Sequence, residues 1–334
     1  MKRHILVILI LILAFFDVKA QDPVFSQYYS APLQLNPAFA GVGYAPNFVA
    51  NYRNQWPSLN AYQTYAISYD QFVSHLNSGF GLMVLTDDAG QGLIRTNKVS
   101  GFFAYRVQVN NDLFIKIGAE AGLVQARYDW TKFRFLDQID DILGPISPGG
   151  IPFPTEEIPP VDPTNTYFDA SAGILVYNKI FYGGFSIKHL NTPNETILFI
   201  NDNLNGGLPI RYSFHGGAQI QLRQGNKRSP SAFISPNIMH VRQGDFGQTN
   251  VGAYVSYGAV FAGAWYRHAR TTSDAGIALV GVEQGVFKIG YSYDFTISNL
   301  SNVSGGTGGS HEISLRVKLR EPKESINDCF RLFR

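Results

Sequence analysis

The sequence predicts an all-β fold: a transmembrane antiparallel β-barrel of about 14 strands, preceded by an N-terminal segment. Three observations carry this prediction. Charged residues make up only 16% of the 334 residues and aromatic residues 14%, and the chain contains 33 glycines and 18 tyrosines. Apolar and polar residues alternate with a period of two along many segments. The longest connections between these segments all fall on one side of the predicted sheet.

The first 20 residues are predicted to be a secretory signal peptide. Two basic residues precede an uninterrupted apolar run, residues 5–16, which is too short to span a bilayer. Val18 and Ala20 provide the small residues that a signal peptidase recognises, so cleavage is expected between Ala20 and Gln21. Because Gln21 is not a cysteine, no lipoprotein anchor is expected.

The mature chain is expected to be formally neutral. The signal peptide takes three basic residues and one acidic residue from totals of 27 and 25, which leaves 24 of each. A neutral chain without a basic stripe lacks the footprint of a nucleic-acid-binding protein, so no nucleic-acid partner is expected. Cys329 is the single cysteine of the sequence, which excludes an internal disulfide and a zinc site built on several thiolates.

Strands, not helices, are expected to cross the membrane, because the mature sequence contains no apolar run of twenty residues. The clearest alternation is in residues 311–319, and residues 99–107 and 113–123 repeat it. A lysine or arginine facing lipid at the middle of a bilayer would cost about 2–4 kcal/mol. Arg106 and Lys116 are therefore expected to face a polar lumen.

Segments with this alternation are predicted as strands in the following order: residues 46–55, 61–71, 78–87, 95–109, 112–128, 166–177, 180–188, 209–223, 229–242, 249–257, 259–268, 274–283, 286–298 and 309–319. An even number is typical of single-chain outer-membrane barrels. Tight turns follow several even-numbered strands, whereas the three longest connections, residues 129–165, 189–208 and 299–310, follow odd-numbered ones. Short periplasmic turns and long outer loops produce this asymmetry.

Three segments flank or interrupt the predicted barrel, residues 46–319. Residues 21–45 contain no strand pattern and either fold into the lumen as a plug or form a periplasmic lead-in. Residues 130–165 contain seven of the 17 prolines, which cannot donate to a sheet ladder, so an extracellular loop is predicted there. Residues 320–334 are predicted to be a periplasmic C-terminal tail.

The alternative architecture is a secreted β-sandwich. Two features disfavour it. The polar positions hold Gly, Ser, Asn and Gln more often than Lys or Glu. Aromatic residues also gather near strand ends, as at Tyr65 and Tyr69, at Trp265 and Tyr266, and at Tyr291, which is typical of girdles at the two membrane interfaces.

Catalytic chemistry is not predicted. The seven histidines lack metal-ligand spacing, and no nucleophile elbow, P-loop or dinucleotide fingerprint is present. Ser213 and His215 share one face of a strand, and we interpret them as polar lumen residues in preference to a hydrolase dyad. The sequence assigns no catalytic, cofactor-binding or metal-binding residue and predicts that the protein is not an enzyme.

Several short sequence motifs indicate a family. Residues 22–28 and 35–41 resemble the N-terminal signature of the PorP/SprF family of outer-membrane proteins of type IX secretion systems. Further motifs similar to those of that family follow in the same order along the chain: residues 52–57, 183–193, 263–267, 290–298 and 309–315.

This resemblance implies a non-enzymatic outer-membrane component of protein secretion and gliding motility, with no cofactor. The implied partners are outer-membrane lipid, large secreted cargo or adhesin proteins with C-terminal sorting domains, and the periplasmic ring machinery with its lipoprotein subunits. On this hypothesis the outer loops hold cargo, while the N-terminal segment and the tail face the machinery below. The alternative function is a passive channel or a hydrophobic-ligand transporter, since a barrel of this size can enclose an open lumen.

The residues of these motifs are interpreted mostly as structural. Trp56 is expected to end the first strand together with Pro57. Asp294 is expected to face the lumen and to pair with a lysine or arginine there or with the N-terminal segment. The full set of family-motif residues is Asn36, Pro37, Arg53, Trp56, His189, Leu190, Trp265, Arg267, Tyr291, Asp294, His311 and Glu312.

Overall fold

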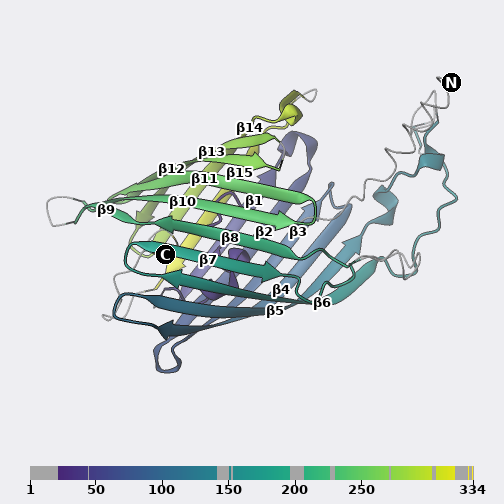
Figure 1. Ribbon diagram of the computed structural model, residues 1–334. Helices are drawn as coiled ribbons and strands as arrows, with labels where there is room; N and C mark the ends of the chain where they lie inside the picture. Colours follow the sequence, from purple (N-terminus) through teal and green to yellow (C-terminus); the bar gives the residue numbers. More distant parts are fainter. Residues whose placement is uncertain are drawn as a thin grey trace, which may run out of the picture.

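The computed structural model describes residues 22–43, 45–140, 150–151, 153–195, 207–225, 230–270, 272–302, 306–319, 330 and 333. The predicted signal peptide, Gln21 and most of the predicted tail lie outside these described residues. Within them, a single antiparallel sheet closes into a barrel (Figure 1), as predicted. No helix of the described part is long and apolar enough to cross a membrane.

The strands of the described residues pair in sequence order, and the last pairs with the first to close the barrel. They are β1 (Asn47–Gln55), β2 (Tyr62–Val73), β3 (Ser78–Ala89), β4 (Ile94–Gln108), β5 (Phe114–Tyr128), β6 (Thr164–Tyr177), β7 (Phe181–Lys188), β8 (Arg211–Ala218), β9 (Ile220–Arg223), β10 (Ala232–Gln243), β11 (Phe246–Tyr257), β12 (Val260–Ala269), β13 (Ser273–Gln284), β14 (Phe287–Thr296) and β15 (Ser310–Lys318). Both β8 and β9 pair with β10 and together occupy one strand position of the barrel wall. We call each such position a stave, and the barrel has the predicted 14 staves.

One predicted strand, residues 209–223, is divided in two. β8 pairs with Asn237–Gln243 and β9 pairs with Ala232–Ile234, so the interruption lies opposite Pro236. Proline has no N–H and cannot donate to the ladder at that point. The division therefore has a local cause in the partner strand.

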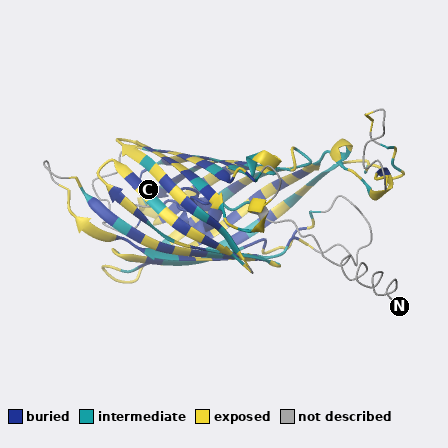
Figure 2. Ribbon diagram, turned by 90° about the horizontal axis from the view of Figure 1, so that it is seen from above, coloured by how far each residue is buried: buried dark blue, intermediate teal, exposed yellow. Residues whose placement is uncertain are grey.

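The two faces of the wall alternate as predicted. In β15, Glu312, Ser314 and Arg316 are buried inside the barrel, and the exposed Ile313 and Leu315 lie between them on the outer face. Figure 2 shows the same alternation of buried and exposed residues along the strands. Lys116 is buried on the inner face, and the guanidinium of Arg106 lies 4.4 Å from the centroid of the Phe72 ring near the turns. Neither cation faces lipid, as expected.

The two rims of the barrel differ in the length of their connections. At one rim, which we call the turn end, β4 reaches Gln108 and β5 starts at Phe114, and similar short turns join β2 to β3 and β13 to β14. At the other rim, which we call the loop end, residues 129–163 and 189–210 connect β5 to β6 and β7 to β8. The one-sided distribution of long connections is confirmed.

Short helices occur only outside the strands of the described residues. In the N-terminal segment they are α2 (Pro32–Leu35) and η1 (Pro37–Phe39). In the connections they are η2 (Pro57–Leu59), η3 (Ser74–Leu76), η4 (Trp130–Lys132), η5 (Leu136–Gln138) and η6 (Asn299–Asn302).

Part of the lumen is apolar, contrary to the expectation of a polar inner face. Met239, Val241, Tyr254 and Ile277, on staves β10 to β13, are buried in one hydrophobic cluster with residues of the N-terminal segment. Trp265 also belongs to this cluster, so its expected place in an aromatic girdle was wrong. Successive residues of a strand point to opposite faces, and only its neighbour Tyr266 faces outward.

Candidate functional site: the plugged lumen

Residues 22–43 fill the interior of the barrel, and we call them the plug. Asp22 lies at the loop end, where its backbone N–H donates to the Gln243 side chain at 3.1 Å. The plug then descends through the lumen to the turn end, where the N–H of Gly41 donates to Asp70 at 2.9 Å. Almost every residue from Phe25 to Val42 is buried. The chain therefore enters β1 from inside its own barrel.

Two prolines and one asparagine shape the middle of the plug. Pro32 and Pro37 each occupy the first position of a short helix, where a missing N–H costs nothing. Asn36 caps the second helix, since its side-chain oxygen accepts from the N–H of Ala38 at 2.8 Å. The Asn36 amide nitrogen lies 3.1 Å from the carbonyl oxygen of Ile174 and 3.1 Å from Nε2 of His215. One side chain thus stabilises the turn and fixes it to the wall.

Glycines of the wall make room for the plug. A Cβ atom on Gly118 would lie 2.3 Å from the backbone nitrogen of Ala38, and one on Gly79 would lie 1.9 Å from the carbonyl oxygen of Ala40. A Cβ on Gly173 would lie 2.0 Å from the Asn36 side-chain oxygen. The wall therefore has glycine at the positions where the plug backbone or the Asn36 side chain approaches it most closely.

A group of charged residues, which we call the outer charge cluster, fixes the plug near the loop end. It consists of Arg53 of β1, Arg267 of β12, Asp274 of β13, Asp294 of β14 and Glu312 of β15. The Arg53 guanidinium lies 3.0 Å from Asp294 and 3.1 Å from Glu312. Arg267 also pairs with Asp294 and lies 3.1 Å from Asp274.

The plug completes this cluster with two adjacent residues. The backbone N–H groups of Ser26 and Gln27 donate to the two carboxylate oxygens of Glu312 at 2.8 and 2.9 Å. The Ser26 hydroxyl donates to Asp294 at 2.6 Å and accepts from Arg53 at 2.6 Å. Asp294 therefore pairs both with arginines and with the N-terminal segment, which are the two partners expected for it.

A second group, which we call the His189 cluster, holds the start of the plug. Nε2 of His189 lies 2.8 Å from Asp22, and its Nδ1 lies 2.9 Å from Asp169. Arg211 lies 3.2 Å from the same Asp22 carboxylate. Lys98, Glu120 and Lys188 extend the network: Lys98 lies 2.6 Å from Asp169 and 2.8 Å from Glu120, and Lys188 lies 3.2 Å from Glu120.

His189 stands just beyond β7, in the left-handed backbone region at φ 59°. Burial alone would lower the pKa of His189, but the carboxylates of Asp22 and Asp169 outweigh it and raise the pKa to about 9. The ring is therefore protonated at neutral pH and acts as a cation between two carboxylates. This pairing accounts for a residue with positive φ being held in a buried position.

A cavity of about 90 Å³ lies between the plug and the wall beside this cluster. Its lining includes Asp22, Lys98, Tyr167, His189 and Glu195. No group of three or more potential ligands in the described residues is arranged to hold a metal ion. His189 and Arg211 pair with Asp22 of the plug at this end.

Aromatic packing fixes the plug to the part of the wall that β10 and β12 form. The Tyr29 ring stacks on Trp265 with centroids 5.5 Å apart. The Trp265 N–H donates to the Asn237 side-chain oxygen at 2.6 Å, and the Tyr28 hydroxyl donates to the same oxygen. The plug therefore has contacts on both sides of the barrel, which fixes it laterally.

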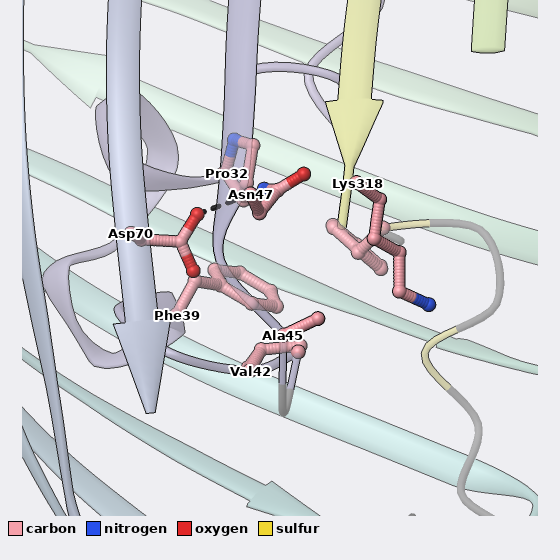
Figure 3. Close-up of a pocket in the computed structure, with 9 residues that line it drawn as sticks. Pro32, Phe39, Val42, Ala45, Asn47, Asp70 and Lys318 are labelled. Atoms are coloured by element: carbon pink, nitrogen blue, oxygen red, sulfur yellow. Dashed lines mark hydrogen bonds between the residues drawn. The ribbon is translucent and has the colours of Figure 1, made fainter. Parts of the chain in front are cut away.

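The turn end holds the last residues of the plug. Asp70 accepts from Asn47 at 2.8 Å as well as from Gly41, and Figure 3 shows it beside Phe39 and Val42 around a small pocket. Lys116 donates to the Ala40 carbonyl oxygen at 2.5 Å.

Two residues of the C-terminal tail also reach this site. The Phe333 ring stacks on Phe39 with centroids 4.6 Å apart. Phe330 packs edge-on against Tyr177 with centroids 4.6 Å apart. Both phenylalanines are buried. The described residues of the tail therefore contact the plug from the turn end.

The sequence-predicted motif residues separate into two groups. Eight of them contact the plug or belong to it: Asn36, Pro37, Arg53, His189, Trp265, Arg267, Asp294 and Glu312. Arg267 donates to the Ser26 hydroxyl at 3.4 Å and also pairs with Asp294. Leu190 and Tyr291 are exposed, the Tyr291 hydroxyl lies 2.8 Å from Nδ1 of His311 on the outer face, and Trp56 follows β1 at the loop end. Ala20 and Gln21 lie outside the described residues.

Sequence reasoning missed the residues of the His189 cluster other than His189 itself. Lys98, Glu120, Asp169 and Lys188 all occupy inward positions of their strands, where an unpaired charge is expensive. The alternation along each strand could have predicted that these residues face inward. Their pairing was not predictable, because it joins staves that are distant in sequence.

Ser213 and His215 both lie on the inner face, and His215 lies against Asn36 of the plug. Their position in the lumen agrees with the interpretation as polar lumen residues.

Comparison with known proteins bears on both fold and family. Residues 17–317 match the family described as type IX secretion system membrane protein PorP/SprF. Comparison with curated proteins gives no significant match.

The solved structures to which the chain is similar include the following three. BamA from Haemophilus ducreyi is 10% identical, with a TM-score of 0.37 over 82% of this chain and 70% of that one. CdiB from Acinetobacter baumannii is 7% identical, with a TM-score of 0.44 over 83% of this chain and 60% of that one. A deletion mutant of the monoaromatic hydrocarbon channel TodX is 10% identical, with a TM-score of 0.42 over 86% and 92%.

Proposed function

The chain belongs to the PorP/SprF family of type IX secretion system membrane proteins, and from this premise we propose that it is a plugged outer-membrane anchor for secreted cargo. The barrel fold and the family both support a location in the outer membrane, and the family is one of secretion components and not of known enzymes. The observation that carries the proposal is the plug, which is bound to the wall by ion pairs, hydrogen bonds and aromatic contacts.

The plug argues against the rival function of an open channel. A removable stopper needs few and weak contacts, whereas this plug meets two ion-pair networks, an aromatic cluster and a set of wall glycines. Breaking a buried ion pair by removing one partner costs about 3–5 kcal/mol, so spontaneous release of the whole plug is strongly unfavourable. A hydrophobic-ligand transporter would likewise require this material to leave the lumen.

The proposed cargo-binding surface is the loop between β5 and β6. Trp130, Phe133 and Phe135 pack together, with ring centroids 5.0 Å apart between Trp130 and Phe135. Beyond them, Leu136 and Ile158 are 89% and 83% exposed. These exposed apolar side chains are the ones that we propose a partner protein covers.

The loop also has internal order that would present such a surface. The Asp137 carboxylate accepts from the backbone N–H of Glu156 at 2.7 Å and from the Thr155 hydroxyl at 2.8 Å. The two halves of the Pro-rich connection are therefore joined. We propose that a C-terminal sorting domain of a secreted adhesin docks here, with periplasmic ring and lipoprotein subunits at the opposite rim, in support of secretion and gliding motility.

The test replaces residues 131–161 by a short Gly/Ser bridge, which leaves β5 and β6 whole, in cells that produce the tagged protein. We expect secreted cargo to be lost from the cell surface and from complexes captured through the tag. A finer variant replaces the exposed apolar residues Leu136, Ile158 and Val161 by serine. Its matched control replaces the exposed acids Glu156, Glu157 and Asp162 of the same loop by alanine. Unchanged surface retention of cargo in the deletion would contradict this docking surface.

A further inference from the structure

The outer face of β4 and β5 carries an apolar band that stops short of the loop end. Lys98 of β4 lines the lumenal cavity and Val124 of β5 is buried, so the odd-numbered residues of both strands face outward. The odd-numbered positions of residues 99–107 and 115–123 hold only small, aliphatic or aromatic residues. Nine residues of a strand tilted by about 35–45° rise about 22–25 Å, close to the height of an outward apolar band. These two segments therefore cover the hydrocarbon layer.

Two arginines lie in register beyond this band, on the side of the long loops. Arg95 is directly opposite Arg127, so both lie on the same face of the wall. Each stands four residues beyond the end of the band, at Val99 and Leu123, which are also opposite each other and are 56% and 61% exposed. Four residues rise about 10 Å at the same tilt. Because a long side chain can bend back along the wall, both guanidinium groups are within reach of the lipid headgroups.

The two arginines differ in their partners. Arg95 lies 2.6 Å from Asp88, and its side chain is still 56% exposed. Arg127 is exposed and forms no ion pair within the described part of the chain. Like charges directly opposite each other on a sheet are destabilising. An anion placed between the two guanidinium groups would remove this repulsion.

The loop between β5 and β6 brings a third cation to the same place. The Lys132 ammonium donates to the Gln91 carbonyl oxygen at 2.6 Å, which fixes it over the connection between β3 and β4. A Cβ atom on Gly92 would lie 2.8 Å from Nζ of Lys132 and 3.6 Å from Oδ1 of Asp88. The ammonium group therefore lies beside the ion pair that Asp88 forms with Arg95.

Positive charge exceeds negative charge at this place. Asp129, at 3.6 Å from Lys132, is the second acid of the group. The three bases Arg95, Arg127 and Lys132 thus face the two acids Asp88 and Asp129, which leaves one positive charge. Further along the loop in sequence, Arg134 and Asp162 add one charge of each sign and do not change this balance.

We propose that Arg95, Arg127 and Lys132 form a binding site for the phosphorylated headgroup of a lipid in the outer leaflet. Arginine binds phosphate oxygens through two parallel N–H groups, and the long loops mark this rim as the outer one. The apolar surface directly below, at Val99 and Leu123, would contact the acyl chains of the same lipid. A free anion or an acidic protein would satisfy the charge but not this surface.

This inference rests on the outer-membrane location given under the proposed function, and it does not depend on cargo docking. The first experiment measures binding of lipid A to the full-length protein in detergent by native mass spectrometry. We expect saturable binding that weakens at least tenfold for Arg127→Gln and recovers for Arg127→Lys. Since Arg127 has no ion-pair partner among the described residues, the midpoint of thermal unfolding should not change. Equal binding by Arg127→Gln and the parent protein would overturn the site.

The matched control is Arg242→Gln. Arg242 is exposed on the outer face of β10 near the same rim, but it lies opposite Tyr212 and Gly247 and has no second base in register. It should bind lipid A like the parent protein. A loss equal to that of Arg127→Gln would show a general effect of surface charge and would contradict the site.

The second experiment separates the sources of the anion. Lipid A from which the phosphates have been removed should bind at least tenfold more weakly, and equal binding would overturn recognition of the headgroup. Inorganic phosphate or an acidic peptide that displaces lipid A at equal concentration would also overturn the proposal. Because binding is measured on the purified protein without cargo, failure here is distinguishable from loss of cargo retention in cells.

Discussion

At the scale of single residues, the plug depends on carboxylates that several partners share. Asp294 meets Arg53 at 3.0 Å, pairs with Arg267 and accepts the Ser26 hydroxyl at 2.6 Å. Its side chain is 2% exposed, so water does not compensate for the loss of a partner. The two arginines on either side would remain in the lumen if this carboxylate were removed.

Asp294→Ala is therefore expected to destabilise the protein by about 3–5 kcal/mol, the cost of breaking a buried ion pair from one side. Equilibrium unfolding of the purified barrel in urea measures this effect. The control is Tyr291→Phe, which removes one exposed hydrogen bond to His311 on the outer face and should cost less than about 1 kcal/mol. Equal effects of the two variants would show that the outer charge cluster does not hold the plug.

His189 gives the plug a dependence on pH. Its pKa is raised to about 9, so the stabilisation from its protonated form is complete below the ordinary pKa of about 6.5 and is lost as the pH rises through 9. Titration of the ring by NMR should give an apparent pKa near 9 that falls towards 6.5 in Asp22→Asn. A midpoint near 6.5 in the unsubstituted protein would contradict the pairing of His189 with Asp22.

At the scale of elements, the wall and the plug are fitted to each other through glycine. Gly118→Ala would place a Cβ 2.3 Å from the backbone nitrogen of Ala38, so the plug must shift. Overpacking of this kind costs about 1–3 kcal/mol. The matched control is Gly183→Ala, since a Cβ there meets nothing within 4 Å. Thermal unfolding of both variants tests the fit, and a Gly118→Ala midpoint equal to that of the control would contradict it.

The tail forms a second contact with the plug. Phe333→Ala removes the ring that stacks on Phe39 and should cost about 3–5 kcal/mol, the usual cost of truncating a buried phenylalanine. Unfolding in urea measures the change. An exposed phenylalanine on the lipid face, Phe295, is the control for general loss of aromatic area. If Phe333→Ala unfolds like the parent protein, the tail does not stabilise the plug.

Alternation along single strands allowed the staves to be predicted because it is a local property. β5 and β15 follow their predicted inward and outward residues throughout. The division between β8 and β9 was not predictable, since its cause, Pro236, lies in the adjacent strand. Because Trp265 and Tyr266 are successive residues of β12, they must face opposite sides of the wall. Assigning both to a girdle was therefore inconsistent with the alternation.

At the scale of the whole molecule, the site was less predictable than the fold. The sequence indicated Asp294 and the motif residues around it, and it left open whether residues 21–45 form a plug or a lead-in. Contacts between Asp22 and His189, or between Asn36 and Ile174, join positions that are more than a hundred residues apart. No periodic pattern encodes such pairs, because the closure of the barrel brings them together.

The direction of the plug changes the expected orientation of the N-terminal segment. Asp22 lies at the loop end and Gly41 at the turn end, so the segment starts on the outer side and not below the barrel. The end of the plug and the described residues of the tail lie at the turn end, together with the short turns between strands. These are the parts of the described chain that a periplasmic partner would meet.

The central claim is that the plug closes the barrel and makes it an anchor. Planar-bilayer conductance of the purified full-length protein at neutral pH tests this most directly. A variant without residues 22–43 serves as the control for insertion and should carry a steady current through the emptied lumen. The account predicts that the full-length protein inserts and remains silent. A stable open current from the full-length protein would contradict it and would identify a channel.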